Sequence, residues 1–487
     1  MAKSTLEEIR KQREEKLKNL RKAGINPYPQ KAISRLPINE VLLNFEKLKG
    51  KELTLVGRIK SIREHGGSTF LHFEDGSGKI QAFLRRDKLG KEQYQFFLDN
   101  FDIGDFVLIK GELFETKRGE KTIEAKEYQM LSKSLLPLPE KWHGLQDVEE
   151  RFRKRYLDLL MNPEVREKFV LRSKIISEIR KYLEKEGFIE VETPILQSIP
   201  GGAAAEPFKT HLNALDIDLY LRIAPELYLK RLLVGGFEKV FEIGRVFRNE
   251  GMDKSHNPDF TTLEFYWAYV DYEVLMEFSE KMLENIVTNI FGSPKITYQG
   301  KEIDFTTPFE RVDFFALLTE KIGAEPQKLK DEELQKIAEK LKIPTEKKSR
   351  AKLLDDIFKK ECREEILSPT FVLHQPIELT PLAKRDEKDP SKAARFQLVV
   401  AGWELINAFS ELNDPIEEKK RFEEEAKARE KGEKETHPFD EDYIEALEYG
   451  MPPAGGLGMG IDRLCALLTD SKTLREIILF PLMKPQK

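Results

Sequence analysis

Cysteine is scarce in this sequence, because Cys362 and Cys465 are the only two among 487 residues. Two isolated cysteines exclude a disulfide framework and a cysteine-based zinc site. No run approaches the ~20 apolar residues that a membrane helix needs. The opening residues also lack the apolar stretch of a signal peptide. We therefore expect a cytoplasmic protein that has no membrane partner.

Neither sign of charge dominates the chain. Its 81 basic and 86 acidic residues give a net charge of −5, which argues against a protein whose whole surface binds nucleic acid. A local basic patch is nevertheless present at residues 1–22, where eight Lys and Arg residues stand against four Glu residues. Apolar residues from Leu6 to Leu20 recur there at helical spacing, and Gly24 follows as a stop signal. This basic helical arm (1–48) is either a solvated helix held by one apolar stripe or an arm that touches phosphates.

Aromatic residues are plentiful, since 31 Phe, 13 Tyr and 3 Trp are too many for a solvated coil. Residues 49–136 contain five strand-like runs with glycine turns and one helical stretch near 91–100, a pattern that favours a closed barrel of the OB type. The exposed face of such a barrel binds nucleic acid by stacking bases on aromatic rings. The candidate rings, each with core packing as the alternative, are Phe70, His72, Phe73 and Phe83.

A hinge is predicted at 137–160, where prolines and a charged stretch interrupt the pattern. Residues 161–487 then show strand runs followed by helices, which predicts an α+β fold with a largely antiparallel sheet flanked by helices. The strands are expected at 238–250, 261–269, 371–373 and 395–412, and the main helices at 162–186, 226–234, 272–291 and 416–431. A Lys/Glu-rich stretch at about 325–365 is predicted to be a helical insertion with a solvated face.

The pair of strands at 238–250 and 261–269 carries charged residues in an apolar context. Period-two alternation predicts that Arg248 and Glu250 share one face, and that Glu264 and Tyr266 share another. A structural ion pair is one interpretation. The loop between the strands, however, supplies a cation, polar groups and a ring that favour a nucleotide site. These loop residues are Lys254, His256, Asn257 and Phe260.

Two further segments bear chemistry. In the first, alternation places Asn407, Phe409 and Glu411 on one face, which is typical of a pocket wall for a cationic ligand, and Glu404 on the other unless a bulge near Gly402 resets the register. The second is the glycine-rich run 455–460, followed by Arg463. Its glycines resemble a dinucleotide fingerprint, but no βαβ unit surrounds them, so we interpret them as a close backbone approach to a ligand.

Taken together, these motifs resemble those of the class II lysyl-tRNA synthetases of the bacterial type, over essentially the whole chain. The three class motifs correspond to residues 187–194, 247–264 and 456–463. The lysine assignment rests on family-specific strings at 200–203, 224–231 and 407–414. The signature strings HIGH and KMSKS of the other synthetase class are absent.

The resemblance implies an OB-fold anticodon-binding barrel, a class II catalytic domain and a homodimer. It also implies lysine–tRNA ligase activity, in which L-lysine and ATP, a substrate, give lysyl-adenylate and pyrophosphate, and lysine then passes to the 3′ end of tRNA(Lys). No enzyme nucleophile is required, because the lysine carboxylate attacks the α-phosphate directly, so catalysis is positioning plus charge stabilisation.

The resemblance also assigns roles to particular residues. Arg248 is expected to be catalytic, bridging the lysine carboxylate and the α-phosphate. The ATP-binding residues are expected to be Arg248, Glu250, His256, Asn257, Phe260 and Arg463. The lysine-binding residues are expected to be Gly202, Glu226, Arg248, Tyr266, Asn407, Phe409 and Glu411. In the barrel, Phe70 and Gln81 match positions that contact the anticodon.

One position departs from the family pattern. Two carboxylates on paired strands usually bind the cofactor Mg²⁺, and Glu404 provides one of them, but residue 397 is Gln in this chain. An amide oxygen still ligates a hard cation, although it adds no charge. The number of bound Mg²⁺ ions and their affinity are therefore open.

Two other functions compete with this interpretation. A ligase that attaches lysine to a protein would use the same catalytic core, but such relatives lack the barrel. A nucleic-acid-binding scaffold with a degenerate site would have lost Arg248, Glu250 or Arg463, and all three are present. Lysine-dependent ATP–pyrophosphate exchange and tRNA charging separate the three functions.

Overall fold

The computed structural model describes residues 3–32, 35–139, 145, 147–346, 348–430 and 438–486. The chain divides into two compact units, Met1–Gln146 and Asp147–Lys487. This division falls inside the predicted hinge, of which residues 140–144 and 146 lie outside the described residues. Residues 148–160, also assigned to the hinge, are helical and belong to the second unit.

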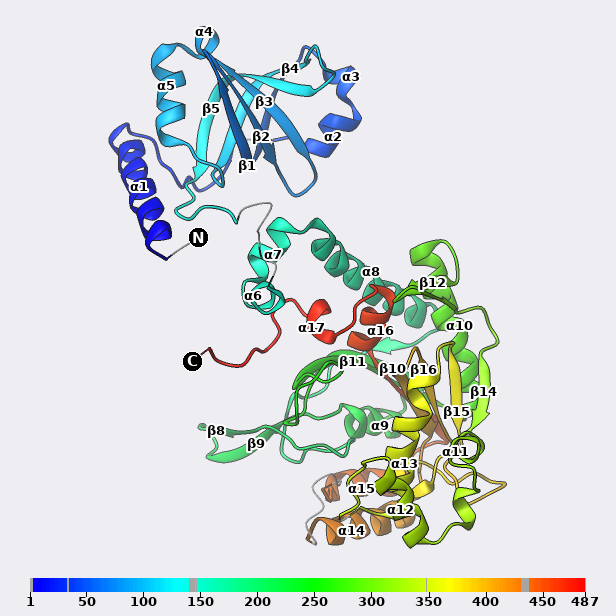
Figure 1. Ribbon diagram of the computed structural model, residues 1–487. Coiled ribbons are helices and arrows are strands. Elements are labelled where there is room, and N and C mark those ends of the chain that lie inside the picture. The colour runs from blue at the N-terminus through cyan, green and yellow to red at the C-terminus, as the bar shows by residue number, and fades with distance from the viewer. Residues whose placement is uncertain are drawn as a thin grey trace. The chain divides into compact units, whose positions relative to one another are not determined.

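The first unit is a closed five-stranded barrel, which confirms the predicted OB-type architecture (Figure 1). Around the barrel the strands follow the order β1-β2-β3-β5-β4. Their bounds are β1 Glu52–His65, β2 Ser68–Glu74, β3 Lys79–Arg85, β4 Phe106–Glu115 and β5 Lys121–Ser132. The helices are α1 Lys3–Lys22, α2 Ile38–Leu43, α3 Phe45–Leu48, α4 Arg86–Leu89 and α5 Lys91–Asn100.

Helix α1 is attached to the barrel by specific contacts. Leu20 is buried in the core of this unit, and Arg13 is 7% exposed. The Arg13 guanidinium donates to the backbone oxygens of Ile103 and Leu136, and Lys16 pairs with Asp102 at 2.8 Å. The apolar stripe therefore holds the helix, as one of the two interpretations predicted.

The second unit is built on an eight-stranded sheet of order β14-β15-β16-β17-β18-β11-β10-β6. Its two outermost pairs, β14/β15 and β10/β6, are parallel and the inner pairs are antiparallel, so the predicted largely antiparallel sheet is confirmed. The sheet strands are β6 Ile189–Glu190, β10 Lys239–Phe247, β11 Asp259–Ala268, β14 Glu310–Asp313, β15 Thr370–Leu373, β16 Arg395–Val400, β17 Trp403–Ser410 and β18 Ala454–Gly460. Smaller sheets contain β7 Leu196–Gln197, β8 Lys209–Leu212, β9 Ile217–Leu221, β12 Lys295–Tyr298 and β13 Lys301–Asp304.

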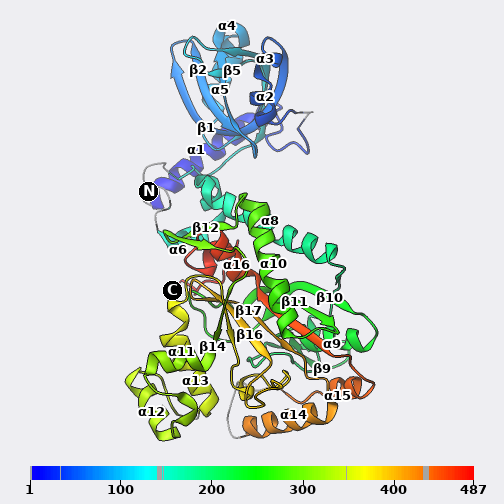
Figure 2. The ribbon, with the colours of Figure 1, turned by 90° about the vertical axis from the view of Figure 1, so that its right-hand side faces the viewer.

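Helices flank this sheet, and α14 and α15 lie together in both views (Figures 1 and 2). The helices are α6 Val148–Arg153, α7 Arg155–Met161, α8 Pro163–Lys185, α9 Glu226–Val234, α10 Tyr272–Phe291, α11 Phe314–Ile322, α12 Asp331–Lys340, α13 Arg350–Glu361, α14 Pro415–Glu430, α15 Glu441–Glu448, α16 Ile461–Leu468 and α17 Leu474–Ile477. Short 3₁₀ turns are η1 Pro326–Lys328, η2 Arg363–Glu365 and η3 Ile377–Leu379. None of the described helices is long and apolar enough to cross a membrane.

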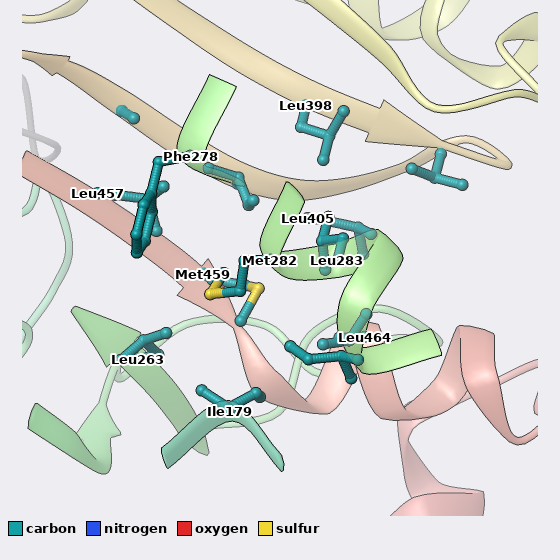
Figure 3. Close-up of a cluster of buried hydrophobic side chains, with 14 of the residues drawn as sticks. Ile179, Leu263, Phe278, Met282, Leu283, Leu398, Leu405, Leu457, Met459 and Leu464 are labelled. Atoms are coloured by element: carbon teal, nitrogen blue, oxygen red, sulfur yellow. The ribbon is translucent and has the colours of Figure 1, made fainter. Parts of the chain in front are cut away.

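The core of the second unit lies between the sheet and the helices α8, α10 and α16. Figure 3 shows its side chains, among them Ile179, Leu263, Phe278, Met282, Leu283, Leu398, Leu405, Leu457, Met459 and Leu464. Because β18 contributes Leu457 and Met459 to this core, its glycines at alternate positions face the other side of the sheet.

The 325–365 insertion is helical, as predicted, but it is not only a solvated surface. Leu334, Leu354 and Phe358 are buried in a separate apolar cluster that includes Phe314 and Val399. The insertion therefore packs against the sheet strand β16.

Candidate active site

One cavity of about 400 Å³ lies on the face of the sheet that carries the β18 glycines. Strands β11, β17 and β18 supply its floor, and the chain segments after β10 and before α9 supply its walls. It brings together every residue that the sequence predicted for the catalytic domain: Gly202, Glu226, Arg248, Glu250, His256, Asn257, Phe260, Tyr266, Glu404, Asn407, Phe409, Glu411 and Arg463.

Gly456 makes room for the acidic end of this cavity. A Cβ atom at this position would lie 1.9 Å from Glu411 Oε1 and 2.5 Å from the Tyr266 ring. At Gly458, two residues along the same face, the nearest atom would be 3.8 Å away. The close backbone approach predicted from the glycine run is therefore required at Gly456, where it accommodates two pocket side chains.

Glu411 is the deepest acidic group of the cavity. Its side chain is 0% exposed, and its Oε2 lies 2.5 Å from Lys230 Nζ. Oε1 has no hydrogen-bond partner among the described residues. Burial raises the pKa of Glu411 well above its ordinary value, and the Lys230 ammonium opposes that rise. A buried carboxylate oxygen without a partner is costly unless a ligand donates to it.

Arg248 lies at the opposite, polar part of the cavity. Its guanidinium stacks over the Phe260 ring at 5.1 Å, and it forms no hydrogen bond or ion pair with any described side chain. Burial lowers the pKa of Arg248 below its usual range, and Glu250 and Glu264 oppose that shift. An arginine remains charged at neutral pH, so this guanidinium is available to an anionic ligand.

One prediction about strand faces is wrong, and for another the structure shows the bulge that the sequence analysis gave as the alternative. Strand β10 ends at Phe247, and the chain leaves the sheet when Asn249 N donates to Glu206 O at 2.7 Å. Arg248 and Glu250 therefore do not share a strand face, although both line the cavity. On β17 the register shift falls at Leu405 rather than near Gly402, and it brings Glu404 to the same side as Asn407.

The predicted ATP-binding residues differ in their exposure and in their hydrogen bonds to the protein. Glu250 and His256 are exposed at the cavity rim, and His256 Nδ1 contacts Asp253 at 2.9 Å. The Asn257 amide nitrogen donates to the backbone and side chain of Asp259, so this residue also supports its own loop. Arg463 Nη1 donates to Glu404 O at 2.8 Å.

Three residues in or next to the cavity were not predicted from the sequence as ligands: Arg395 and Glu264, which line it, and Lys230, which does not. Lys230 sits between Glu226 and Glu411, and Arg395 Nε donates to Asn407 Oδ1 at 2.7 Å. Burial, with a smaller contribution from Glu226, raises the pKa of Glu264 to about 8, and Arg248 opposes this rise. A signal for Lys230 existed in the sequence, because Glu226 and Lys230 are four residues apart on one helix.

The position predicted to bind Mg²⁺ has a single carboxylate. Gln397 pairs with Asn407 and Val399 pairs with Glu404, so Gln397 and Glu404 share one face of the sheet. The described residues contain no group of three or more His, Cys, Asp or Glu side chains that could hold a metal. This set suits Mg²⁺, which is commonly held by one or two carboxylates together with substrate phosphates.

On the barrel, the predicted anticodon residues lie near one another. Phe70 stacks on Phe83 with centroids 4.4 Å apart, whereas Phe73 is fully buried in the core. Gln81 Nε2 donates to Glu120 at 2.8 Å, and Gln81 Oε1 accepts from Thr122 at 2.9 Å. Strand pairing of Phe70 with Phe83 and of His72 with Gln81 puts these four side chains on the outer face.

Comparison with known families defines the class of the protein. Residues 147–484 match the class II tRNA synthetases (D, K and N), and residues 53–131 match the OB-fold nucleic acid binding domain of the tRNA anti-codon type. The matched ranges coincide with the cavity-bearing unit and with the barrel. The chain belongs to the class II tRNA synthetases.

Its relatives within that class are lysine–tRNA ligases. The enzyme of Carboxydothermus hydrogenoformans is 50% identical over 483 residues, which cover 99% of each chain. The enzyme of Thermotoga maritima is 49% identical over 488 residues, covering 99% of this chain and 97% of its own. The enzyme of Aquifex aeolicus is 52% identical over 440 residues, covering 90% of this chain and 74% of its own. The particular family of this chain is thus the lysine–tRNA ligases.

Proposed function

We propose that this chain activates L-lysine with ATP to lysyl-adenylate and pyrophosphate, and then transfers lysine to the 3′ end of tRNA(Lys). Family membership supports the overall reaction. The cavity supports the assignment of the two substrate ends, because one part of it is acidic and buried and the other carries the Arg248 guanidinium, which has no partner among the described side chains.

The observation that carries the lysine assignment is Glu411. Its Oε1 is buried without a hydrogen-bond partner at the end of the cavity, where a long side chain with a terminal ammonium would reach it. Tyr266, Asn407 and Phe409 line this end. A site that hydrogen-bonds an ammonium rejects an apolar isostere strongly, because the isostere leaves the carboxylate unpaired. Glu226 and the backbone of Gly202 would receive the α-ammonium.

Arg248 would bridge the lysine carboxylate and the α-phosphate. Two anions must approach each other in the first step, and a planar guanidinium donates to both while cancelling their repulsion. Phe260 and Arg463 would hold the adenine ring between them, Glu250 would bind the adenosine, and His256 and Asn257 would contact the phosphates. Catalysis in this scheme requires positioning rather than a nucleophilic side chain.

The proposal is tested by ATP–pyrophosphate exchange with each of the twenty amino acids, followed by charging of tRNA(Lys). We expect exchange with lysine alone and charging of the tRNA. Exchange with another amino acid would refute the lysine assignment. Exchange with lysine but no charging would indicate a ligase that modifies a protein, and no exchange at all would indicate a degenerate site.

A Gly456→Ala substitution is expected to raise the KM for lysine by about tenfold, with little effect on the KM for ATP. The new Cβ would overlap Glu411 Oε1 and displace the carboxylate or Tyr266. Gly458→Ala is the matched control on the same strand face, because a Cβ there has 3.8 Å of clearance. Steady-state exchange kinetics measure both variants, and equal KM values for lysine would contradict this account of Gly456.

Mg²⁺ would be held by Glu404, with the Gln397 amide, on the same face of the neighbouring strand, as a second ligand. When bound it would neutralise charge on the ATP phosphates. A Gln397→Glu substitution is expected to lower the Mg²⁺ concentration for half-maximal exchange several-fold, because a second carboxylate strengthens the site. Magnesium titrations of both proteins provide the measurement, and identical titration curves would show that residue 397 does not contact the ion.

The outer face of the barrel is the proposed anticodon site. Phe70 would stack on a base, and Gln81 would read a base edge. A Phe70→Ala substitution is expected to raise the KM for tRNA(Lys) about tenfold, because a base–aromatic stack contributes ~1–3 kcal/mol. Lysine-dependent exchange without tRNA should stay unchanged, and an equal loss in both assays would indicate a folding defect instead.

We propose a homodimer and a cytoplasmic location for this ligase. The first class motif follows α8 and includes Ile189, which is 51% exposed at the edge strand β6; nearby in sequence, Ile195 and Leu196 are 45% and 48% exposed. Apolar side chains exposed along one segment are typical of a surface that a partner covers. Light scattering tests the assembly, with twice the chain mass of 56.6 kDa expected and a single chain mass contradicting it.

The location follows from the substrates, and immunolocalisation outside the cytoplasm would contradict it.

A further inference from the structure

Lys230 is a buried cation that does not itself line the cavity but contacts two residues that do. Its side chain is 0% exposed on helix α9, and its Nζ lies 2.6 Å from Glu226 Oε1 and 2.5 Å from Glu411 Oε2. The same nitrogen faces the Phe409 and Tyr266 rings at 5.6 and 6.0 Å. Lys230 thus contacts both carboxylates that the proposed function assigns to the two ammonium groups of the substrate.

Negative charge exceeds positive charge around this lysine. Glu418, on α14, is 1% exposed, and neither of its carboxylate oxygens has a hydrogen-bond partner among the described residues. The titratable and charged groups that surround Lys230 are Glu226 from α9, Glu264 and Tyr266 from β11, Glu411 after β17, Glu418 and Arg421 from α14, and Tyr443 from α15. Several carboxyl groups therefore share few cations, and a substrate with two ammonium groups supplies what is missing.

Lys230 stays protonated in this environment. Burial alone lowers the pKa of Lys230, but Glu226 and Glu411 outweigh it and raise that pKa well above the ordinary value. For the nearby carboxyl groups, burial favours the neutral form. It raises the pKa of Glu411 and raises that of Glu418 to about 7. The Lys230 ammonium opposes the shift of both carboxyl groups, and Arg421 opposes that of Glu418.

We propose that Lys230 is a positioning residue of the lysine pocket, which holds Glu226 and Glu411 in place and favours the ionised form of Glu411. Each carboxylate then keeps one oxygen on Lys230 and offers the other to a substrate ammonium, because a carboxylate accepts up to about four hydrogen bonds. Selection of a diamino acid thus depends on a lysine of the protein itself. This inference rests on the proposed function, because it assumes that lysine occupies the cavity.

The test is the pH dependence of lysine-dependent exchange in Lys230→Met. Without the ammonium, two neighbouring buried carboxylates cannot both ionise easily, so one takes up a proton. We expect the KM for lysine to rise tenfold or more at pH 7 and the KM for ATP to change less than twofold. The apparent pKa that governs kcat/KM for lysine should shift upward by about one unit, so that raising the pH restores part of the loss. Wild-type enzyme is measured at the same pH values, and the ratio of the two kcat/KM values removes the effect of substrate titration.

A matched control and a second measurement make the outcomes decisive. Lys239→Met removes a lysine of strand β10 that lies outside the cavity, and it should leave both KM values and the pH profile unchanged. If Lys230→Met does not fold, a crystal structure of the wild-type enzyme with lysine decides, and Glu411 should contact both Lys230 Nζ and the substrate ε-nitrogen. Equal changes in the two KM values without a pH shift, or a bound lysine with Lys230 away from both carboxylates, would overturn the inference. Wild-type enzyme without lysine-dependent exchange would instead overturn the proposed function.

Discussion

Arg248→Ala is expected to lower kcat/KM for lysine-dependent exchange by about 10²- to 10³-fold. The guanidinium makes no hydrogen bond or ion pair with the described side chains and lies in the cavity over Phe260, so its donors are free for substrate. Removing a preorganised donor from developing negative charge has effects of that size. Because Arg248 would contact both lysine and ATP, the loss should appear in kcat and in both KM values. Exchange kinetics with either substrate varied provide the measurement.

Arg245→Ala is the matched control for this prediction. Arg245 lies three residues before Arg248 on strand β10, is exposed, and pairs with Asp259 at 3.4 Å outside the cavity lining. We expect its exchange kinetics to stay within about twofold of wild type, as is usual for surface substitutions. Equal losses in the two variants, or a drop in thermal stability that explains the Arg248→Ala result, would contradict the catalytic role of Arg248.

Glu411→Gln is expected to raise the KM for lysine by about 10²-fold or more, with the KM for ATP within about threefold of wild type. The amide is close in size to the carboxylate but carries no charge, so both the substrate ammonium and Lys230 lose a partner in a buried site. Truncating one member of a buried, hydrogen-bonded charge pair costs ~2–5 kcal/mol. Exchange kinetics with lysine and ATP varied separately measure the two KM values.

Glu417→Gln is the matched control, because Glu417 lies outside the cavity lining and pairs with Arg421 on the same helix. It should leave the KM for lysine unchanged. Equal increases in the two KM values of Glu411→Gln would refute the assignment of Glu411 to the lysine side chain.

Strand alternation predicted the face of the pocket where the strands are regular. Asn407, Phe409 and Glu411 line the cavity as expected, because no bulge interrupts β17 after Ile406. Tyr266 and Glu264 do so for the same reason on β11. Regular alternation fails at Glu404, because a register shift at Leu405, close to the bulge considered near Gly402, interrupts the pairing of β16 with β17.

Contacts between segments distant in the sequence could not be predicted from local patterns. Arg248 was assigned to a strand, but a hydrogen bond from Asn249 to Glu206 takes the chain out of the sheet. The i, i+4 pair of Glu226 and Lys230 is visible in the sequence, whereas the contact of Lys230 with Glu411 depends on how α9 packs against strands β10 and β11 of the sheet. The residues assigned from the family motifs nevertheless line one cavity, because the chain has the fold of that family.

The most direct test of the account is a crystal structure of the enzyme with L-lysine and a non-hydrolysable ATP analogue. The account predicts that the lysine ε-nitrogen lies about 3 Å from Glu411 Oε1 and that the Arg248 guanidinium contacts both the lysine carboxylate and the α-phosphate. It would be contradicted by a complex in which Arg248 turns to a protein partner away from both ligands and Glu411 remains paired with Lys230 alone.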